Sequence, residues 1–235
     1  MAKRAEAANR AKDEFLAVLS HELRTPLAPI LLWGRGLLSG SVGMKDLDRA
    51  MKAIVQSAES QSRLIEDLLD LARLNSGGLL LAPVSCCVED VVRAAVEVIR
   101  PLAQAKGIRL DVALGEVGIA VVDPGRSQQV LWNLLSNAVK FTPASGMVSL
   151  RLGKRDAHLE VEVSDTGRGI APEFLPQLFE RFRQQDTGHN REHKGLGIGL
   201  ALSRHVVELH GGALSVHSDG LGCGSNELAV VAGRQ

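Results

Sequence analysis

SHELRTPL, residues 20–27, lies in a stretch whose apolar residues follow the period of a helix. Leucines recur there at steps of three and four residues and share one helix face: Leu16, Leu19, Leu23 and Leu27. His21 follows Leu19 by two residues, about 200° around the helix axis, so it points away from that face. A histidine exposed beside Glu22 is an unusual use of a helix surface. We therefore take these two side chains as the first candidates for chemistry.

The composition excludes several classes of protein. Of 235 residues, 45% are hydrophobic and only 3% are aromatic, so we expect a core of aliphatic side chains. The 27 Lys and Arg balance the 27 Asp and Glu, which argues against nucleic acid or a membrane surface as partner. No apolar run approaches the roughly 18 residues of a membrane-spanning helix, and no signal peptide is recognised. Three cysteines make no disulfide framework, and we expect a cytoplasmic protein.

Two long helices are expected at the start of the chain. The first covers residues 3–38 and should break or bend near Pro26, because proline removes a helical hydrogen bond. Turn residues follow at 39–43, and a heptad pattern extends over residues 45–75. A lone helical hairpin buries too little apolar surface, so we expect a homodimer in which two hairpins form a four-helix bundle. The alternative is an intramolecular hairpin that packs on a second domain.

After the turn residues 75–78 the pattern changes to mixed strands and helices. This change predicts two domains, a helical hairpin over residues 1–76 and a second domain over residues 77–235. Strands are predicted at 79–84, 108–114, 119–122, 147–154, 158–164, 213–218 and 226–231, and helices at 88–105, 123–141 and 200–210. This order predicts an α+β two-layer sandwich.

Two short motifs in the second domain are typical of nucleotide binding. In the helix that begins at Asp123, one stripe carries Asn133, Asn137 and Lys140, and amide oxygens with a lysine suit a magnesium–phosphate cluster. A solvated polar face is the alternative for this stripe. The sequence DTGRGI, residues 165–170, follows a strand, and its glycines would let a flat ligand approach the backbone. An ordinary turn is the alternative there.

A third motif, GLGIGL at residues 195–200, opens a helix, where backbone N–H groups and the helix dipole favour phosphate. Its G-x-G-x-G spacing excludes a dinucleotide-binding fingerprint, and it lacks the Gly-Lys-Ser/Thr of a P-loop. The polar residues 185–194, which follow FERFRQ at 179–184, are expected to form a lid over the nucleotide. His189 and His193 lie in this lid without further ligands, so we do not expect a metal site there.

Together these motifs resemble the catalytic core of a sensor histidine kinase of the two-component type. The matching segments follow the order of that family: phospho-acceptor box at 20–27, N box at 133–142, first glycine box at 165–170, F box at 179–182 and second glycine box at 195–199. Order and spacing agree over nearly the whole chain. Because the chain begins close to the phospho-acceptor box, we expect it to be part of a longer protein.

The resemblance implies a role for each motif residue. His21 would accept the γ-phosphoryl group of ATP, Glu22 would hold the proton on the other ring nitrogen, and Thr25 would orient water for dephosphorylating a partner aspartate. Asn137 would bind Mg²⁺ with support from Asn133. The remaining residues would hold the nucleotide: its phosphates by Lys140, Gly195, Gly197 and Gly199, and its adenine by Phe141, Asp165, Gly167 and Gly169.

The expected function is that of an ATP-dependent protein-histidine kinase. It would autophosphorylate His21, pass the phosphoryl group to an aspartate of a response-regulator receiver domain, and also act as the phosphatase of that domain. The alternative is a non-catalytic, nucleotide-binding dimeric scaffold that presents His21 to an external phosphodonor.

The chain departs from the family pattern at three places, one of which is Val231-Ala232 in place of the usual Leu-Pro. Gln184 lies where some members carry a lid arginine, which leaves the role of a lid arginine open. Glu227 replaces the usual phenylalanine of the closing strand, so we expect that strand to pair in a shifted way or to end early. The expected consequence is lower stability rather than lost catalysis.

Overall fold

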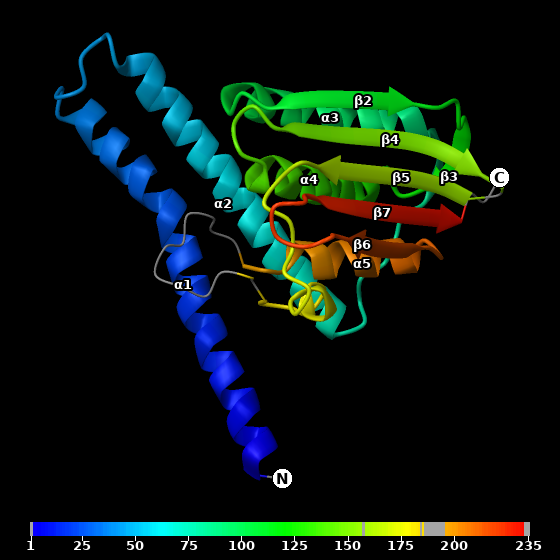
Figure 1. Ribbon diagram of the computed structural model, residues 1–235. Helices are drawn as coiled ribbons and strands as arrows, with labels where there is room; N and C mark the ends of the chain where they lie inside the picture. The colour runs from blue at the N-terminus through cyan, green and yellow to red at the C-terminus, as the bar shows by residue number, and fades with distance from the viewer. Residues whose placement is uncertain (1, 157, 184, 186–195, 233–235) are drawn as a thin grey trace. The chain divides into compact units, whose positions relative to one another are not determined.

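The chain forms two compact units that follow one another in sequence, with the boundary after Gly78. The computed structural model describes residues 2–156, 158–183, 185 and 196–232. Figure 1 labels the helices and strands of both units. The first unit is a pair of helices, and the second combines helices with a mixed sheet, as the residue patterns predict. None of the described helices is long and apolar enough to cross a membrane.

The first unit consists of α1, Ala2–Leu38, and α2, Leu47–Asn75, which pack along one another as a hairpin (Figure 1). Backbone hydrogen bonds from Ser41 and Val42 to the carbonyl of Gly36, 3.0 and 3.2 Å long, close the connection. A side chain at Gly36 would place its Cβ 2.7 Å from a methyl group of Val42. A larger residue at this position would therefore force the Val42 side chain to move.

Of the break or bend expected near Pro26, the break is absent, because α1 continues as one helix through Pro26 and Pro29, and the bend stays a prediction. Neither proline has an N–H group, so the carbonyls of Glu22 and Thr25 receive no helical hydrogen bond from four residues ahead. The intact turns on either side hold the helix together. The consequence is local: two backbone acceptors are freed directly after His21.

The second unit begins with β1 (Val84–Cys87), α3 (Val88–Ala105), β2 (Arg109–Leu114), β3 (Ile119–Val122) and α4 (Pro124–Phe141). It continues with β4 (Met147–Arg155), β5 (His158–Asp165), α5 (Gly199–Leu209), β6 (Ala213–His217) and β7 (Ser225–Ala232). A short 3₁₀ turn covers Leu175–Gln177.

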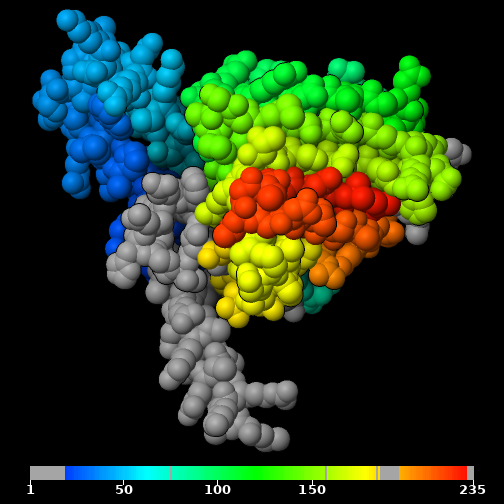
Figure 2. Space-filling model, in the orientation of Figure 1, coloured from blue at the N-terminus to red at the C-terminus, as the bar shows by residue number. Residues whose placement is uncertain are grey.

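One sheet in the spatial order β2-β4-β5-β7-β6 forms the first layer, and only its β2–β4 pair is parallel. Helices α3, α4 and α5 cover one face as the second layer, while β1 and β3 form a separate antiparallel pair (Figure 1). The opposite face of the sheet lies at the surface in the space-filling view (Figure 2). Side chains alternate accordingly: on β5, Leu159 and Val163 are buried, whereas Glu160 and Glu162 point to the open face. The predicted two-layer sandwich is confirmed.

Two expectations about strands are wrong. Residues 79–83 are not a strand, and the N–H group of Ala82 instead donates to the carboxylate of Asp123 at 2.8 Å. Strand β7 is neither shifted nor shortened, since it pairs with β5 along its whole length from Ser225 to Ala232. A glutamate within β7 does not disturb this pairing because the ladder bonds join backbone groups only.

Asp123 joins three segments at the start of α4. One carboxylate oxygen accepts the N–H of Arg126 as a helix cap, the other accepts the N–H of Ala82, and the Asp123 N–H donates to Nε2 of His210. Burial by itself raises the pKa of Asp123, but the hydrogen bonds from Ala82 and Arg126 outweigh it and hold the pKa below its ordinary value. His210 must carry its proton on Nδ1, which donates to the carbonyl of Val206 at 2.8 Å.

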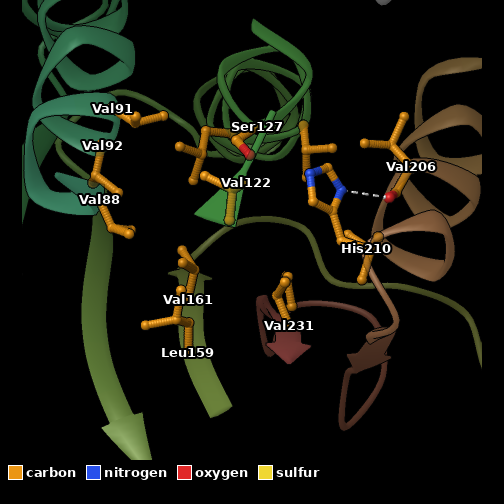
Figure 3. Close-up of a pocket in the computed structure, with 14 residues that line it drawn as sticks. Val88, Val91, Val92, Val122, Ser127, Leu159, Val161, Val206, His210 and Val231 are labelled. Atoms are coloured by element: carbon orange, nitrogen blue, oxygen red, sulfur yellow. Dashed lines mark hydrogen bonds between the residues drawn. The ribbon is translucent and has the colours of Figure 1, made fainter. Parts of the chain in front are cut away.

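A cavity of about 60 Å³ lies between the sheet and the helices (Figure 3). Its walls are aliphatic apart from Ser127 and His210. They come from the starts of α3, α4 and β5, from the ends of β3, α5 and β7, and from His210 directly after α5. Leu159 and Val161 border it, whereas Asp165 ends the same strand. The cavity is therefore a packing gap at the end of the sandwich remote from Asp165.

We expect Val161→Ile to stabilise the second unit by about 1 kcal/mol, because the added methylene enters the cavity instead of displacing neighbours. The measurement is the urea midpoint at unchanged slope. Val98→Ile is the matched control, since Val98 is 56% exposed on α3 and its added methylene stays in water. A lower midpoint for Val161→Ile would show that the gap cannot accept a methylene.

Candidate active site

His21 and Glu22 lie beside each other on α1, as the residue spacing predicts. Nδ1 of His21 is 3.4 Å from Oε1 of Glu22, and the side chains are 48% and 13% exposed. The imidazole is thus open to solvent while the carboxylate is held against the hairpin. A proton on Nδ1 leaves the lone pair of Nε2 free for a reaction with an electrophile.

Thr25 lies one turn after His21, and its hydroxyl donates to the backbone carbonyl of His21 at 3.0 Å. This bond fixes the side-chain rotamer and directs the lone pairs of the Thr25 oxygen away from the helix backbone. The hydroxyl is thereby available as an acceptor next to the imidazole.

The polar stripe of α4 is divided between two environments. Asn133 is buried and its amide donates to the carbonyl of Gly199 at 3.3 Å and to the hydroxyl of Ser203 at 3.2 Å, so it ties α4 to the start of α5. Asn137, one turn further, is half-buried and forms no side-chain hydrogen bond within the part of the chain that the structure describes. Asn137 therefore offers an uncommitted amide, while Asn133 has a structural bond to maintain.

Lys140 and Phe141 end α4, and both lie against cationic or aromatic neighbours. Nζ of Lys140 is 5.0 Å from the centre of the Phe141 ring, and the guanidinium of Arg168 is 4.4 Å from the same ring. The N–H of Arg168 also donates to the carbonyl of Phe141 at 3.2 Å. Two positive charges and an aromatic face thus come together at the end of α4, which suits a ligand with a planar base and phosphates.

Asp165 ends β5 and is held from two sides. Oδ1 accepts the N–H of Gly167 at 2.7 Å, and Oδ2 accepts the hydroxyl of Ser225, the first residue of β7. The strand register places Asp165 directly opposite Ser225. Both oxygens keep further lone pairs, so the carboxylate can accept a hydrogen bond from an amino group of a ligand.

The first glycine box owes its glycines to close backbone packing. A Cβ on Gly167 would lie 2.5 Å from Oδ1 of Asp165 and 2.6 Å from the carbonyl of Phe141. Gly169 has φ +69°, and a Cβ there would lie 2.0 Å from the carbonyl of Gly220. Close backbone packing is therefore enough to explain Gly167 and Gly169, without a need for space beside a nucleotide base. Any side chain at these positions would push the first glycine box away from α4 and from the loop before β7.

The second glycine box lies partly outside the described residues, and with it Gly195, Gln184 and most of the expected lid, including His189 and His193. Gly197 is described and has φ +66°, and its carbonyl accepts the N–H of Phe182 at 2.9 Å. This bond joins the F box to the second glycine box. A Cβ on Gly199 would lie 3.3 Å from the Asn133 side chain, so this glycine lets α5 approach α4.

Lys106, at the end of α3, caps the helix that carries the site. Its ammonium donates to the carbonyls of Val139 and Lys140 at 2.8 and 2.7 Å, which are among the unpaired acceptors at the end of α4. Burial lowers the pKa of Lys106. Two charge-assisted bonds thus anchor α4 directly before Phe141.

We expect Lys106→Met to destabilise the second unit by about 1–3 kcal/mol, because the methionine keeps the apolar stem but leaves both carbonyls unpaired. The measurement is again urea unfolding, with Lys154→Met as control because Lys154 is exposed on β4. Equal midpoints for the two variants would contradict the capping role.

Several residues of the site were not singled out by motif spacing. Ser225 reaches Asp165 through the β5–β7 register, Arg168 covers Phe141 through the first glycine turn, and Lys106 reaches α4 over 33 and 34 residues of sequence. A serine that opens a strand after glycines was a usable signal for Ser225. The contacts of Lys106 and Arg168 depend on tertiary packing alone.

Comparison with known proteins follows this division into two units. Residues 11–77 match the model of the His Kinase A (phospho-acceptor) domain, and residues 122–228 match that of the histidine kinase-, DNA gyrase B-, and HSP90-like ATPases. The chain is 38% identical over 222 residues to the non-motile and phage-resistance protein of Caulobacter vibrioides. It is 40% identical over 219 residues to the circadian input-output histidine kinase CikA of Synechococcus elongatus. These matches cover 92% and 91% of this chain but only 26% and 29% of the two relatives.

Two solved structures resemble the structure of this chain. Full-length ShkA in complex with AMPPNP is 32% identical with a TM-score of 0.69, and the match covers 94% of this chain and 46% of that one. The mycobacterial sensor histidine kinase MprB is 30% identical with a TM-score of 0.55, and the match covers 66% of this chain and 99% of that one. With a phospho-acceptor hairpin followed by an α/β ATPase-type domain, the chain belongs to the sensor histidine kinases.

Proposed function

We propose that the chain is the catalytic core of an ATP-dependent protein-histidine kinase that phosphorylates His21. The observation that carries this proposal is the exposed imidazole of His21 with its Nδ1 beside Glu22. Hydrolysis of a nucleotide alone needs no acceptor side chain, so the His21–Glu22 pair favours kinase chemistry over hydrolysis.

In this reaction Nε2 of His21 forms a bond to the γ-phosphorus, and the bond to the bridging oxygen of ADP breaks. Positive charge then develops on the ring, and Glu22 stabilises it by accepting the hydrogen bond, and finally the proton, of Nδ1. With its proton on Nδ1, the ring presents the lone pair of Nε2 as the nucleophile. Positioning and charge neutralisation supply most of the remaining catalysis.

ATP would be held where α4, the first glycine box and β7 meet. Asp165, anchored by Gly167 and Ser225, would accept the adenine amino group, and Phe141 would lie against the base. Lys140 would neutralise phosphate charge. Asn137 would bind Mg²⁺, because its amide is uncommitted within the described residues and a neutral oxygen suits this cation. Bound Mg²⁺ would offset the charge of the phosphates.

We further propose that His21 passes its phosphoryl group to an aspartate of a receiver domain and that the core also dephosphorylates this domain. The exposure of His21 supports the first step, because the same nitrogen must meet the ATP-binding unit and then a second protein. The acceptor lone pairs of the Thr25 hydroxyl support the second step, because they can orient water beside His21.

A homodimer completes the proposal. Large apolar side chains of both hairpin helices remain exposed in the single chain: Leu32 (70%), Met51 (49%), Val55 (51%), Ile65 (46%) and Leu69 (53%). Exposed apolar surface on this scale marks a protein interface. Two hairpins that bury these side chains against one another would form a four-helix bundle.

The test incubates the protein with Mg²⁺ and γ-labelled ATP. We expect an acid-labile, alkali-stable label, typical of phosphohistidine, that leaves the protein when a receiver domain is added. Mixed dimers that combine one His21→Ala chain with one Asn137→Ala chain would become labelled only if one chain phosphorylates its partner. Nucleotide binding without any label would favour a non-catalytic scaffold over the kinase.

A further inference from the structure

Glu227 is a buried acidic residue in the centre of β7, at the position where the family resemblance leads one to expect phenylalanine. It is 6% exposed, and its Oε2 atom has no hydrogen-bond partner among the described residues. Burying a carboxyl group without a partner is costly, and the cost is greatest when the group is charged. The proposed function assigns no role to this side chain.

The strand register brings Glu227 next to the proposed adenine-binding residue. Glu227 lies opposite Val163 of β5 and Val216 of β6, and Val163 is 1% exposed under the helices. The next inward-facing pair along the same two strands is Asp165 with Ser225. Diagonal neighbours on one face are about 7 Å apart at their backbones, within reach of a long side chain. Two carboxyl groups therefore share one covered face of the sheet.

Burial raises the pKa of Glu227 to about 8, and the negative charge of Asp165 adds to this shift. Glu227 is thus a neutral acid at neutral pH. The Asp165 carboxyl group beside it accepts hydrogen bonds from Gly167 and Ser225. The other titratable or charged groups of the neighbouring strands lie on the open face of the sheet: His158, Glu160 and Glu162 on β5 and His217 on β6. The helices that cover the inner face carry Arg126 and Lys140 on α4 and Arg204, His205 and Glu208 on α5, with His210 directly after α5.

We propose that Glu227 is a positioning residue of the adenine site, which acts through Asp165 and makes nucleotide binding depend on a proton. In its neutral form Glu227 fills the core and leaves Asp165 bound to Gly167 and Ser225. When Glu227 ionises, two carboxylates lie as diagonal neighbours on the same covered face of the sheet and cannot both remain charged there without rearrangement. Asp165 then loses its fixed orientation toward the base. This proposal rests on the assignment of Asp165 as the adenine-binding residue.

The same proton also affects folding, and this effect does not involve nucleotide. The folded-state pKa of about 8 lies above the unfolded value of 4.5, so the folded chain binds the proton more tightly. The stabilisation is fully present below the unfolded value and is lost as pH rises to about 8. Across this window the unfolding equilibrium constant of the wild type should rise, relative to Glu227→Gln, by up to about tenfold per pH unit.

The experiment measures binding of the Mg²⁺ complex of AMPPNP by calorimetry from about pH 6.5 to about pH 9.5. For the wild type we expect the association constant to fall about tenfold across this range. A change of this size corresponds to a pKa of Glu227 that differs by about one unit between the free and the nucleotide-bound protein. Glu227→Gln and Glu227→Leu carry no charge at this position and should change by less than about twofold. Glu160→Gln removes one charge from the open face of the same sheet and should follow the wild type.

The possible results separate the positioning role of Glu227 from a structural role and from a failure of the proposed function. Equal pH profiles for the wild type and both Glu227 variants would overturn the positioning role. The positioning role would also be overturned if the association constant of the wild type did not change with pH while its unfolding constant changed as expected. Glu227 would then be a structural residue only. Absence of AMPPNP binding at every pH would contradict the proposed function itself. If Glu227→Gln fails to fold, Glu227→Leu supplies the uncharged comparison.

Discussion

Replacing His21 by glutamine is expected to abolish labelling by γ-labelled ATP. Glutamine keeps a polar side chain of similar size on the exposed face of α1 but has no nucleophilic nitrogen. The reaction has no acceptor without the imidazole, so the loss should be complete rather than partial. The measurement is incorporation of label per chain over time, together with AMPPNP binding, which should stay within about twofold of the wild type because His21 is not a proposed nucleotide ligand.

The chain offers a close control for this variant. His217 is also exposed and also contacts an acidic side chain, with Nε2 3.0 Å from Oδ1 of Asp219. His217→Gln should be labelled like the wild type. Label that persists in His21→Gln would show that another side chain is the acceptor. Labelling lost in both variants would mean that glutamine acts through general destabilisation.

Changing Asp165 to asparagine is expected to weaken ATP binding by about 100-fold, or close to 3 kcal/mol. Asparagine has one neutral acceptor oxygen; when this oxygen keeps the N–H of Gly167, the NH₂ group takes the place of Oδ2 and donates to the Ser225 hydroxyl. The charged acceptor for the adenine amino group is thereby lost. The measurement is the dissociation constant for AMPPNP.

A nucleotide comparison separates this effect from misfolding. Inosine triphosphate lacks the amino group, so the wild type should prefer ATP strongly, while Asp165→Asn should bind both nucleotides weakly and alike. Asp219→Asn, a change of the same kind at an exposed loop position, should keep the preference. A strong preference for ATP that survives in Asp165→Asn would place adenine recognition elsewhere.

Much of the fold follows from local patterns in the sequence. Alternating side chains predict β4 and β5 as a hairpin, and the structure confirms it with a register from Val148–Asp165 to Arg155–His158. Asp123 before Pro124 predicts the start of α4, and the cap bond to Arg126 is present. These features depend on neighbouring residues only, so a single sequence contains the information.

Expectations failed where distant segments compete for the same groups. The apolar run 79–83 has the composition of a strand, but Asp123 takes the N–H of Ala82. Glu227 was expected to disturb β7, yet the backbone ladder with β5 is complete. The cost of this residue is instead the burial of its carboxyl group. At Pro26 the penalty is a local one and does not end the helix of 37 residues, so the break is excluded while the expected bend stays a prediction.

The sequence by itself determined the order of the two units and the identity of His21, Glu22 and Asp165 as candidates, because these depend on periodicity and short motifs. Only the tertiary structure decided that Ser225 and Gly167 hold Asp165, that Lys106 caps α4, and that Glu227 shares a buried face with Asp165. Hydrogen bonds and charges act through space over a few ångströms, and strand register together with helix packing sets which distant residues come within that range.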